Sequence, residues 1–125
     1  MPSILHIEDN LANQILVQRV LEAAGYAVQH AADGRTGIEM AQAADMDLIL
    51  IDMGLPDIDG QTVVTMLHQI PALATTPMVA ITAWPPEQAL ITAERYGFTG
   101  CILKPIDVAG FPDQIAAFLS PTESS

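Results

Sequence analysis

The residues of this sequence whose types and spacing could do chemistry are acids that follow short apolar runs. Asp52 closes the run Leu48-Ile49-Leu50-Ile51, and Glu8 and Asp9 follow an earlier run that ends at Ile7. A short Ile/Leu-rich run that ends in a Gly/Pro turn predicts a strand buried on both faces. In a parallel sheet, the carboxyl ends of the strands form the edge where ligands bind. We therefore expect Glu8, Asp9 and Asp52 to share one crevice.

This acidic cluster suggests a cation and a phosphoryl group. Three carboxylates in one crevice repel one another and would have raised pKa values unless a cation lies among them. Oxygen ligands suit Mg²⁺, which leaves room for a phosphate. Thr82 and Lys104, the only lysine, end two later apolar runs on the same expected rim. A hydroxyl, a positive charge and a metal would stabilise a phosphoryl group on Asp52. We predict attack by Asp52 on an activated phosphoryl group, which gives an acyl phosphate.

The elements that must position these residues alternate along the chain. The expected strands are 3–7, 26–31, 47–52, 77–82 and 99–103. The expected helices are 13–24, 36–44, 59–70 with Asp59 as its N-cap, 85–96, and a last helix capped by Asp107 that carries Phe111, Ile115 and Phe118. This alternation predicts an α/β fold with a parallel sheet, right-handed crossovers and helices on both faces. The expected form is a single, flavodoxin-like (βα)5 domain, doubly wound, with strand order 2-1-3-4-5.

Composition narrows the possible partners. The 125 residues suffice for one domain, and their net charge is -11. Such a charge repels nucleic acid and anionic membranes. No apolar run approaches the roughly 18 residues of a membrane span, and the start lacks the basic region of a signal peptide. A single cysteine, Cys101, fits a reducing compartment. We expect a cytoplasmic protein that binds neither nucleic acid nor membrane.

From Ile4 to Leu119 the sequence resembles the receiver domain of two-component response regulators, the CheY-like family. The resemblance lies in motifs that agree in type, order and spacing. These are the acidic pair Glu8-Asp9, the phosphoacceptor Asp52 with its loop to Asp57, the switch hydroxyl Thr82 followed by the small Ala83, and the pair Lys104-Pro105. Each motif is weak alone, but together they are highly specific.

The resemblance implies a ligand set, a donor and a domain organisation. It implies Mg²⁺ bound by Glu8 or its waters, Asp9, Asp52 and the backbone carbonyl of Gly54, and a cis bond before Pro105. It implies a phosphoryl group taken from a histidine kinase or a histidine phosphotransfer protein, and a downstream protein target. We expect the receiver domain at 1–120 and a polar tail at 121–125. With no output domain after residue 119, the sequence most resembles the single-domain members of the family.

Departures from the family pattern affect the expected switch. Receivers usually carry Tyr or Phe three residues before the lysine, and here that residue is Cys101. We therefore expect the output to travel through the segment that starts at Thr82-Ala83-Trp84, which Pro85 and Pro86 stiffen. In this family the position of Trp84 borders the path of the hydrolytic water. Our hypothesis is that Trp84 slows loss of the phosphoryl group, and the alternative is that it only packs on the rim.

Other interpretations remain beside the phosphoacceptor switch. A Mg²⁺-dependent aspartyl phosphatase usually has a second Asp two residues after its nucleophile, where this chain has Gly54. A cofactor-binding flavodoxin-like module would need a phosphate loop after the first strand, and Glu8-Asp9 is its electrostatic opposite. We therefore expect no enzyme beyond gain and loss of the phosphoryl group on Asp52. A receiver-like interaction module that works without phosphorylation stays open because of Cys101.

Histidines and surface charge complete the expectations. His6 and His30 fall in expected strands, whereas a phosphodonor histidine in these pathways is exposed on a helical bundle. His68 falls on an expected helix, and we interpret it as an ordinary surface or boundary histidine. Receivers that dimerise often use alternating charges on the fourth helix, fifth strand and fifth helix. On these elements the sequence has few charges, and Arg95 is their only basic residue apart from Lys104 of the site. We therefore expect a monomer or a weak dimer.

Overall fold

A computed structural model describes residues 2–119 of the chain. Its strands are β1 (Ser3–Ile7), β2 (Ala27–Ala31), β3 (Leu48–Asp52), β4 (Met78–Thr82) and β5 (Gly100–Leu103). Its helices are α1 (Leu11–Ala23), α2 (Gly34–Ala43), α3 (Gly60–His68), the short 3-10 helix η1 (Pro71–Leu73), α4 (Pro86–Tyr96) and α5 (Phe111–Leu119). The strands form one parallel sheet in the order β2-β1-β3-β4-β5, which confirms the predicted flavodoxin-like fold. None of the helices in this described part is long and apolar enough to span a bilayer. The predicted polar tail 121–125 lies outside the described residues.

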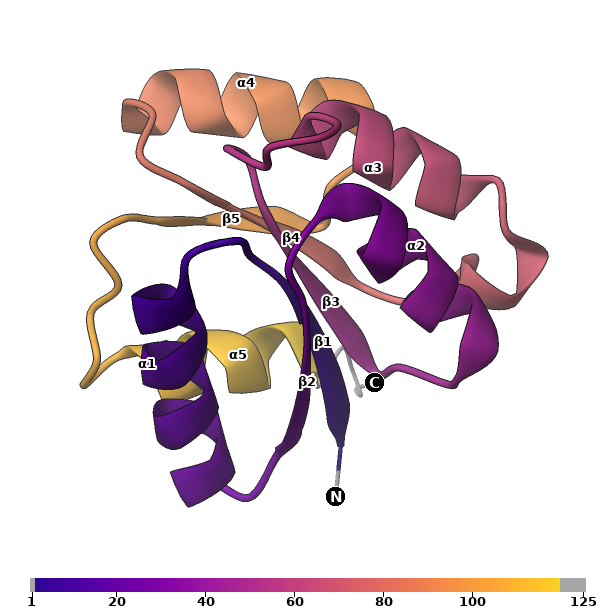
Figure 1. Cartoon of the computed structure of the whole chain (residues 1–125). Coiled ribbons are helices and arrows are strands. Elements are labelled where there is room, and N and C mark those ends of the chain that lie inside the picture. The colour runs from indigo at the N-terminus through magenta and orange to yellow at the C-terminus, as the bar shows by residue number, and fades with distance from the viewer. Residues whose placement is uncertain (1, 120–125) are drawn as a thin grey trace.

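Helices cover both faces of the sheet (Figure 1), with α1 and α5 on one face and α2, α3 and α4 on the other. Alternate residues of the strands point to opposite faces and so supply two cores. Leu5 and Ile7 of β1 belong to the core beneath α2, α3 and α4, whereas Ile4 belongs to the core beneath α1 and α5. Every residue of β3 is buried, as its apolar run predicted. The two cores hold the carboxyl ends of β1 and β3 side by side.

The side chains of Asn10 and Asp59 cap two of the helices and fix where they begin. Asn10 accepts a hydrogen bond from the Asn13 amide at 2.9 Å, so α1 begins two residues earlier than its apolar spacing predicted. Asp59 caps α3, as predicted, through the amide of Thr62 at 2.8 Å.

At two other helix starts the sequence prediction was wrong. Helix α2 was expected to begin at residue 36 but begins at Gly34, because the Asp33 side chain accepts from the Thr36 amide and acts as the N-cap. The expected cap Asp107 lies four residues before α5 and instead accepts the Phe111 amide with its backbone carbonyl at 2.8 Å. A turn therefore separates Asp107 from the helix that it was expected to cap.

Candidate functional site

The three acidic side chains converge at the carboxyl edge of the sheet. Strands β1 and β3 are neighbours, with Ile7 opposite Ile51. The residues that come next, Glu8 and Asp52, therefore lie side by side. Carboxylate oxygens of Glu8, Asp9 and Asp52 all lie within 4.8 Å of one another. Glu8 and Asp52 are only 2% and 3% exposed, whereas Asp9 is exposed. The crevice therefore combines two buried acids with one that faces solvent.

The Lys104 side chain reaches into this crevice from the carboxyl end of β5. Its Nζ lies 2.8 Å from Asp52 Oδ1 and 3.9 Å from Glu8 Oε1. The Lys104 amide donates to the Thr82 carbonyl at 2.7 Å, which keeps the ends of β4 and β5 level. The Lys104–Pro105 bond is cis, as the family resemblance implied. The Lys104 ammonium group thus contacts both buried carboxylates.

Thr82 presents a buried hydroxyl on the same rim. Its Oγ1 accepts a hydrogen bond from the Trp84 amide at 3.0 Å, and the residue is 3% exposed. A hydroxyl that already accepts still has its own proton to donate. Thr82 can therefore donate a hydrogen bond to a group placed on the rim.

The electrostatics of the crevice favour a bound cation. Burial, together with the nearby carboxylate of Asp52, raises the pKa of Glu8 to about 7. The donors are carboxylate oxygens, the ligands that Mg²⁺ prefers. The backbone of Gly54 lies beside them, since a Cβ built on this glycine would be 3.8 Å from Asp52 Oδ2. These residues fit a hard divalent cation.

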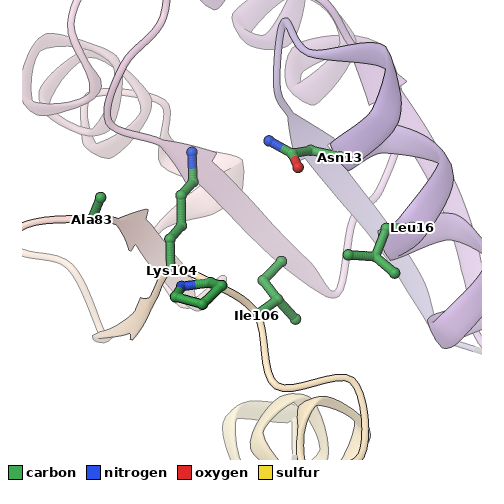
Figure 2. Close-up of a pocket in the computed structure, with 6 residues that line it drawn as sticks. Asn13, Leu16, Ala83, Lys104 and Ile106 are labelled. Atoms are coloured by element: carbon green, nitrogen blue, oxygen red, sulfur yellow. The ribbon is translucent and has the colours of Figure 1, made fainter.

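A hollow of about 430 Å³ opens beside the crevice. Figure 2 shows Asn13 and Leu16 of α1 on one side of it, and Lys104 and Ile106 on the other, with Ala83 near the end of β4. Most of its lining is apolar, whereas the Lys104 ammonium group extends from its wall to Asp52. The acidic crevice is therefore flanked by a surface suited to apolar contacts.

The expected switch residues lie on the rim and on β5. Ala83 and Pro105 are exposed, and Trp84 is half-buried. Cys101 is half-buried on β5 and lines a second hollow, of about 310 Å³, together with Leu90 of α4. Burial raises the pKa of the Cys101 thiol. The small side chain at position 101 thus borders open space.

Sequence reasoning missed two polar side chains that hold Glu8. Asn13 Nδ2 donates to Glu8 Oε1 at 3.3 Å, and the Gln14 side-chain amide donates to the backbone carbonyl of Glu8. Both residues lie in the first turn of α1, which the Asn10 cap folds back over the end of β1. The available signal was that cap, because it brings this turn to the acidic pair.

The three histidines lie in two different settings. His6 and His30 face each other across β1 and β2 with ring centroids 5.1 Å apart. Among the described residues, neither ring nitrogen of His6 has a hydrogen-bond partner. Burial lowers the pKa of His6 to about 3, with smaller contributions from His30 and Lys104 that are part of this shift. His68 is exposed and its Nε2 lies 2.8 Å from the Gly97 carbonyl.

Comparison with known proteins identifies the class. The family model of the response regulator receiver domain matches residues 4–116, so the chain belongs to this family of signalling domains. It is 31% identical to the polar-differentiation response regulator DivK of Brucella ovis, over 94% of this chain and 95% of DivK. It is 37% identical to the DNA-binding dual master transcriptional regulator RpaA of Synechocystis over 98% of this chain, but spans only 51% of RpaA.

Among the similar solved structures is one that carries magnesium. The receiver domain of the sensor histidine kinase PA1611 from Pseudomonas aeruginosa superimposes with a TM-score of 0.86 at 26% identity. The match covers 94% of this chain and 97% of that domain, whose structure has a magnesium ion coordinated in the active-site cleft.

Proposed function

We propose that this receiver domain accepts a phosphoryl group on Asp52 and thereby changes its affinity for a partner protein. The observation that carries the proposal is the placement of Lys104 Nζ at 2.8 Å from Asp52 Oδ1, beside the carboxylates of Glu8 and Asp9. The acceptor, a positive charge and a set of metal ligands are thus assembled at one edge of the sheet. This arrangement supports phosphoryl transfer over the alternative function, an interaction module that works without phosphorylation.

In the proposed reaction, the donor is a phosphohistidine of a histidine kinase or a histidine phosphotransfer protein. A carboxylate oxygen of Asp52 attacks phosphorus, the phosphorus–nitrogen bond breaks, and the bond electrons stay on the leaving imidazole. Lys104 pairs with the developing negative charge, and the Thr82 hydroxyl donates to a phosphoryl oxygen.

Glu8, Asp9, Asp52 and the backbone carbonyl of Gly54 would hold Mg²⁺. When bound, this ion supplies charge neutralisation for the carboxylates and the phosphoryl oxygens. The presence of magnesium in the PA1611 receiver supports this assignment.

The hollow beside Lys104 supports a protein as the donor. Leu16 of α1 and Ile106 supply much of its apolar lining. A donor seated on these side chains would contact the residue that already touches the acceptor oxygen. Apolar contacts of this kind supply binding energy at interfaces.

The test is the intact mass of the protein after incubation with Mg²⁺ and acetyl phosphate. The wild type is expected to gain one phosphoryl group, and Asp52→Ala is expected to gain none. Omission of Mg²⁺ is expected to prevent the gain in the wild type. If the wild type stays unmodified with acetyl phosphate and also with histidine kinases, the interaction module that works without phosphorylation becomes the better interpretation.

Trp84 allows a prediction about the lifetime of the phosphorylated state. Its backbone is tied to Thr82, so its half-buried ring stays on the rim of the site. We expect Trp84→Ala to lose the phosphoryl group several times faster than the wild type, because water reaches the acyl phosphate more freely. The measurement is the decay of the phosphorylated mass after the donor is removed. An unchanged rate would show that Trp84 only packs there.

A further inference from the structure

Two carboxylates from different segments hold the start of α2. Asp33 accepts from the Thr36 amide at 2.8 Å as an ordinary N-cap. Asp57, from the loop between β3 and α3, accepts from the Gly34 amide at 2.8 Å and from the Arg35 amide at 3.0 Å. The first three amides of α2 are therefore satisfied, two of them by a residue outside the helix and its own cap.

The loop that carries Asp57 is fixed at its beginning. The Met53 amide donates to the Ile81 carbonyl of β4 at 3.1 Å. Gly60, the first residue of α3, lies so close that a Cβ added there would be 2.6 Å from Met53 Sδ. Met53 is therefore held between the sheet and α3.

The other end of the loop is fixed against α2. Besides the two hydrogen bonds of Asp57, the Ile58 side chain lies directly on Gly34, since an added Cβ would be 2.5 Å from Ile58 Cγ1. Only Gly54, Leu55 and Pro56 remain between the two anchors, and the proline ring fixes one more dihedral. The Gly54 backbone, beside the Asp52 carboxylate, lies in this short span.

We propose that Asp57 is a positioning residue, whose carboxylate ties the 53–58 loop to α2 and so holds the Gly54 carbonyl ready for a cation. This inference rests on the proposed function, which assigns that carbonyl to Mg²⁺. The Gly34 amide, together with that of Arg35, holds the pKa of Asp57 below its usual range, so the group stays an ionised acceptor. Asp57 is exposed, so it acts through these hydrogen bonds and not through burial.

The chain offers a matched control, because Asp33 caps the same helix without touching the loop. The experiment titrates MgCl2 into wild type, Asp57→Ala, Asp57→Asn and Asp33→Ala by calorimetry at constant ionic strength. We expect the Mg²⁺ Kd to rise about threefold to tenfold in Asp57→Ala, less than for loss of a group that directly orients a ligand. Asp33→Ala is expected to lower the Tm as Asp57→Ala does, yet to keep the wild-type Kd.

Asp57→Asn separates the hydrogen bonds from the lost charge. The amide keeps one acceptor oxygen, so its Kd is expected to lie between those of wild type and Asp57→Ala. Equal values for the two Asp57 variants would overturn the proposal, because a charge effect alone would then explain them. An unchanged Kd in Asp57→Ala, or an equal rise in Asp33→Ala, would overturn it as well.

Hydrogen exchange distinguishes this inference from the proposed function. In the protein without added metal, Asp57→Ala is expected to raise exchange at the Met53 amide, which is hydrogen-bonded to Ile81 at the beginning of the loop, and Asp33→Ala is not. If the wild type bound no Mg²⁺, the assigned metal site would fail, whereas this exchange pattern would still show the positioning. If the pattern were absent while the wild type bound Mg²⁺, only the role of Asp57 would fail.

Discussion

Replacing Lys104 with methionine is expected to lower the rate of phosphoryl uptake from acetyl phosphate by about 100-fold or more, which is the size of effect that loss of a preorganised donor has in enzymes. The reason is the position of its ammonium group, 2.8 Å from Asp52 Oδ1 and 3.9 Å from Glu8 Oε1. Methionine keeps much of the side-chain volume but supplies no charge for the phosphoryl oxygens. The measurement is the time course of the phosphorylated mass at saturating Mg²⁺.

Arg95→Met is the matched control for this prediction. It also removes one positive charge, but from the exposed surface of the last turn of α4. We expect its uptake rate to equal that of the wild type, because exposed charges at a distance are screened by salt. A Lys104→Met protein that is folded and takes up the phosphoryl group at the wild-type rate would remove Lys104 from the proposed mechanism.

Replacing His6 with leucine is expected to protect the fold against acid. His6 is fully buried, and its pKa falls from the ordinary 6.5 to about 3. Below pH 6.5, His6 binds a proton in the unfolded chain but stays neutral in the folded protein. The free energy of unfolding therefore decreases as the pH is lowered, until the folded pKa is reached. Between pH 7 and pH 4.5 this group alone lowers the free energy of unfolding by roughly 2–3 kcal/mol.

The measurement is urea unfolding of wild type and His6→Leu at both pH values. The difference in unfolding free energy between pH 7 and pH 4.5 is expected to be smaller in His6→Leu by that amount. His68→Gln, which changes an exposed histidine, is expected to keep the wild-type dependence. An equal pH dependence in wild type and His6→Leu would show that folded His6 takes up its proton normally, contrary to its buried setting.

Much of the sheet could be predicted because local pattern and tertiary environment agree in it. The run that ends at Asp52 is apolar at every position before the acid, and β3 is buried at every position. Alternation with amphipathic helices left few topologies, and the strand order followed. The placement of Glu8, Asp9 and Asp52 then depended only on β1 and β3 being neighbours.

Helix starts were less predictable because caps compete with turns for the same residues. Asp33-Gly34 has the composition of a turn, but Gly34 is the first residue of a helix, because Asp33 caps that helix and the Gly34 amide donates to the distant Asp57 carboxylate. The prediction that the Asp107 side chain caps α5 was wrong, because the backbone carbonyl of Asp107 accepts the amide at the start of this helix. A contact between distant segments took part at Gly34, whereas the contact at Asp107 is local.

The polar groups that support the site were also beyond reach of the sequence. Asp57 looked like part of a Gly/Pro-rich loop, and its partners on α2 are more than 20 residues away. His6 fits an apolar strand pattern at a position where its two ring nitrogens find no partner among the described residues. No local pattern records such pairings, because they exist only once the strands and helices are assembled.

The two glycines on the inner face of α2 have a mechanical consequence. At Gly34 an added side chain would meet Ile58, and at Gly37 it would meet Ile7 of β1. The gap between α2 and its neighbours is therefore set by main chain against side chain, with no adjustable layer between them. This close packing limits how far α2 can move relative to β1 and to the 53–58 loop. Movement during signalling is then expected elsewhere, along α4 and β5, where Cys101 borders unfilled space.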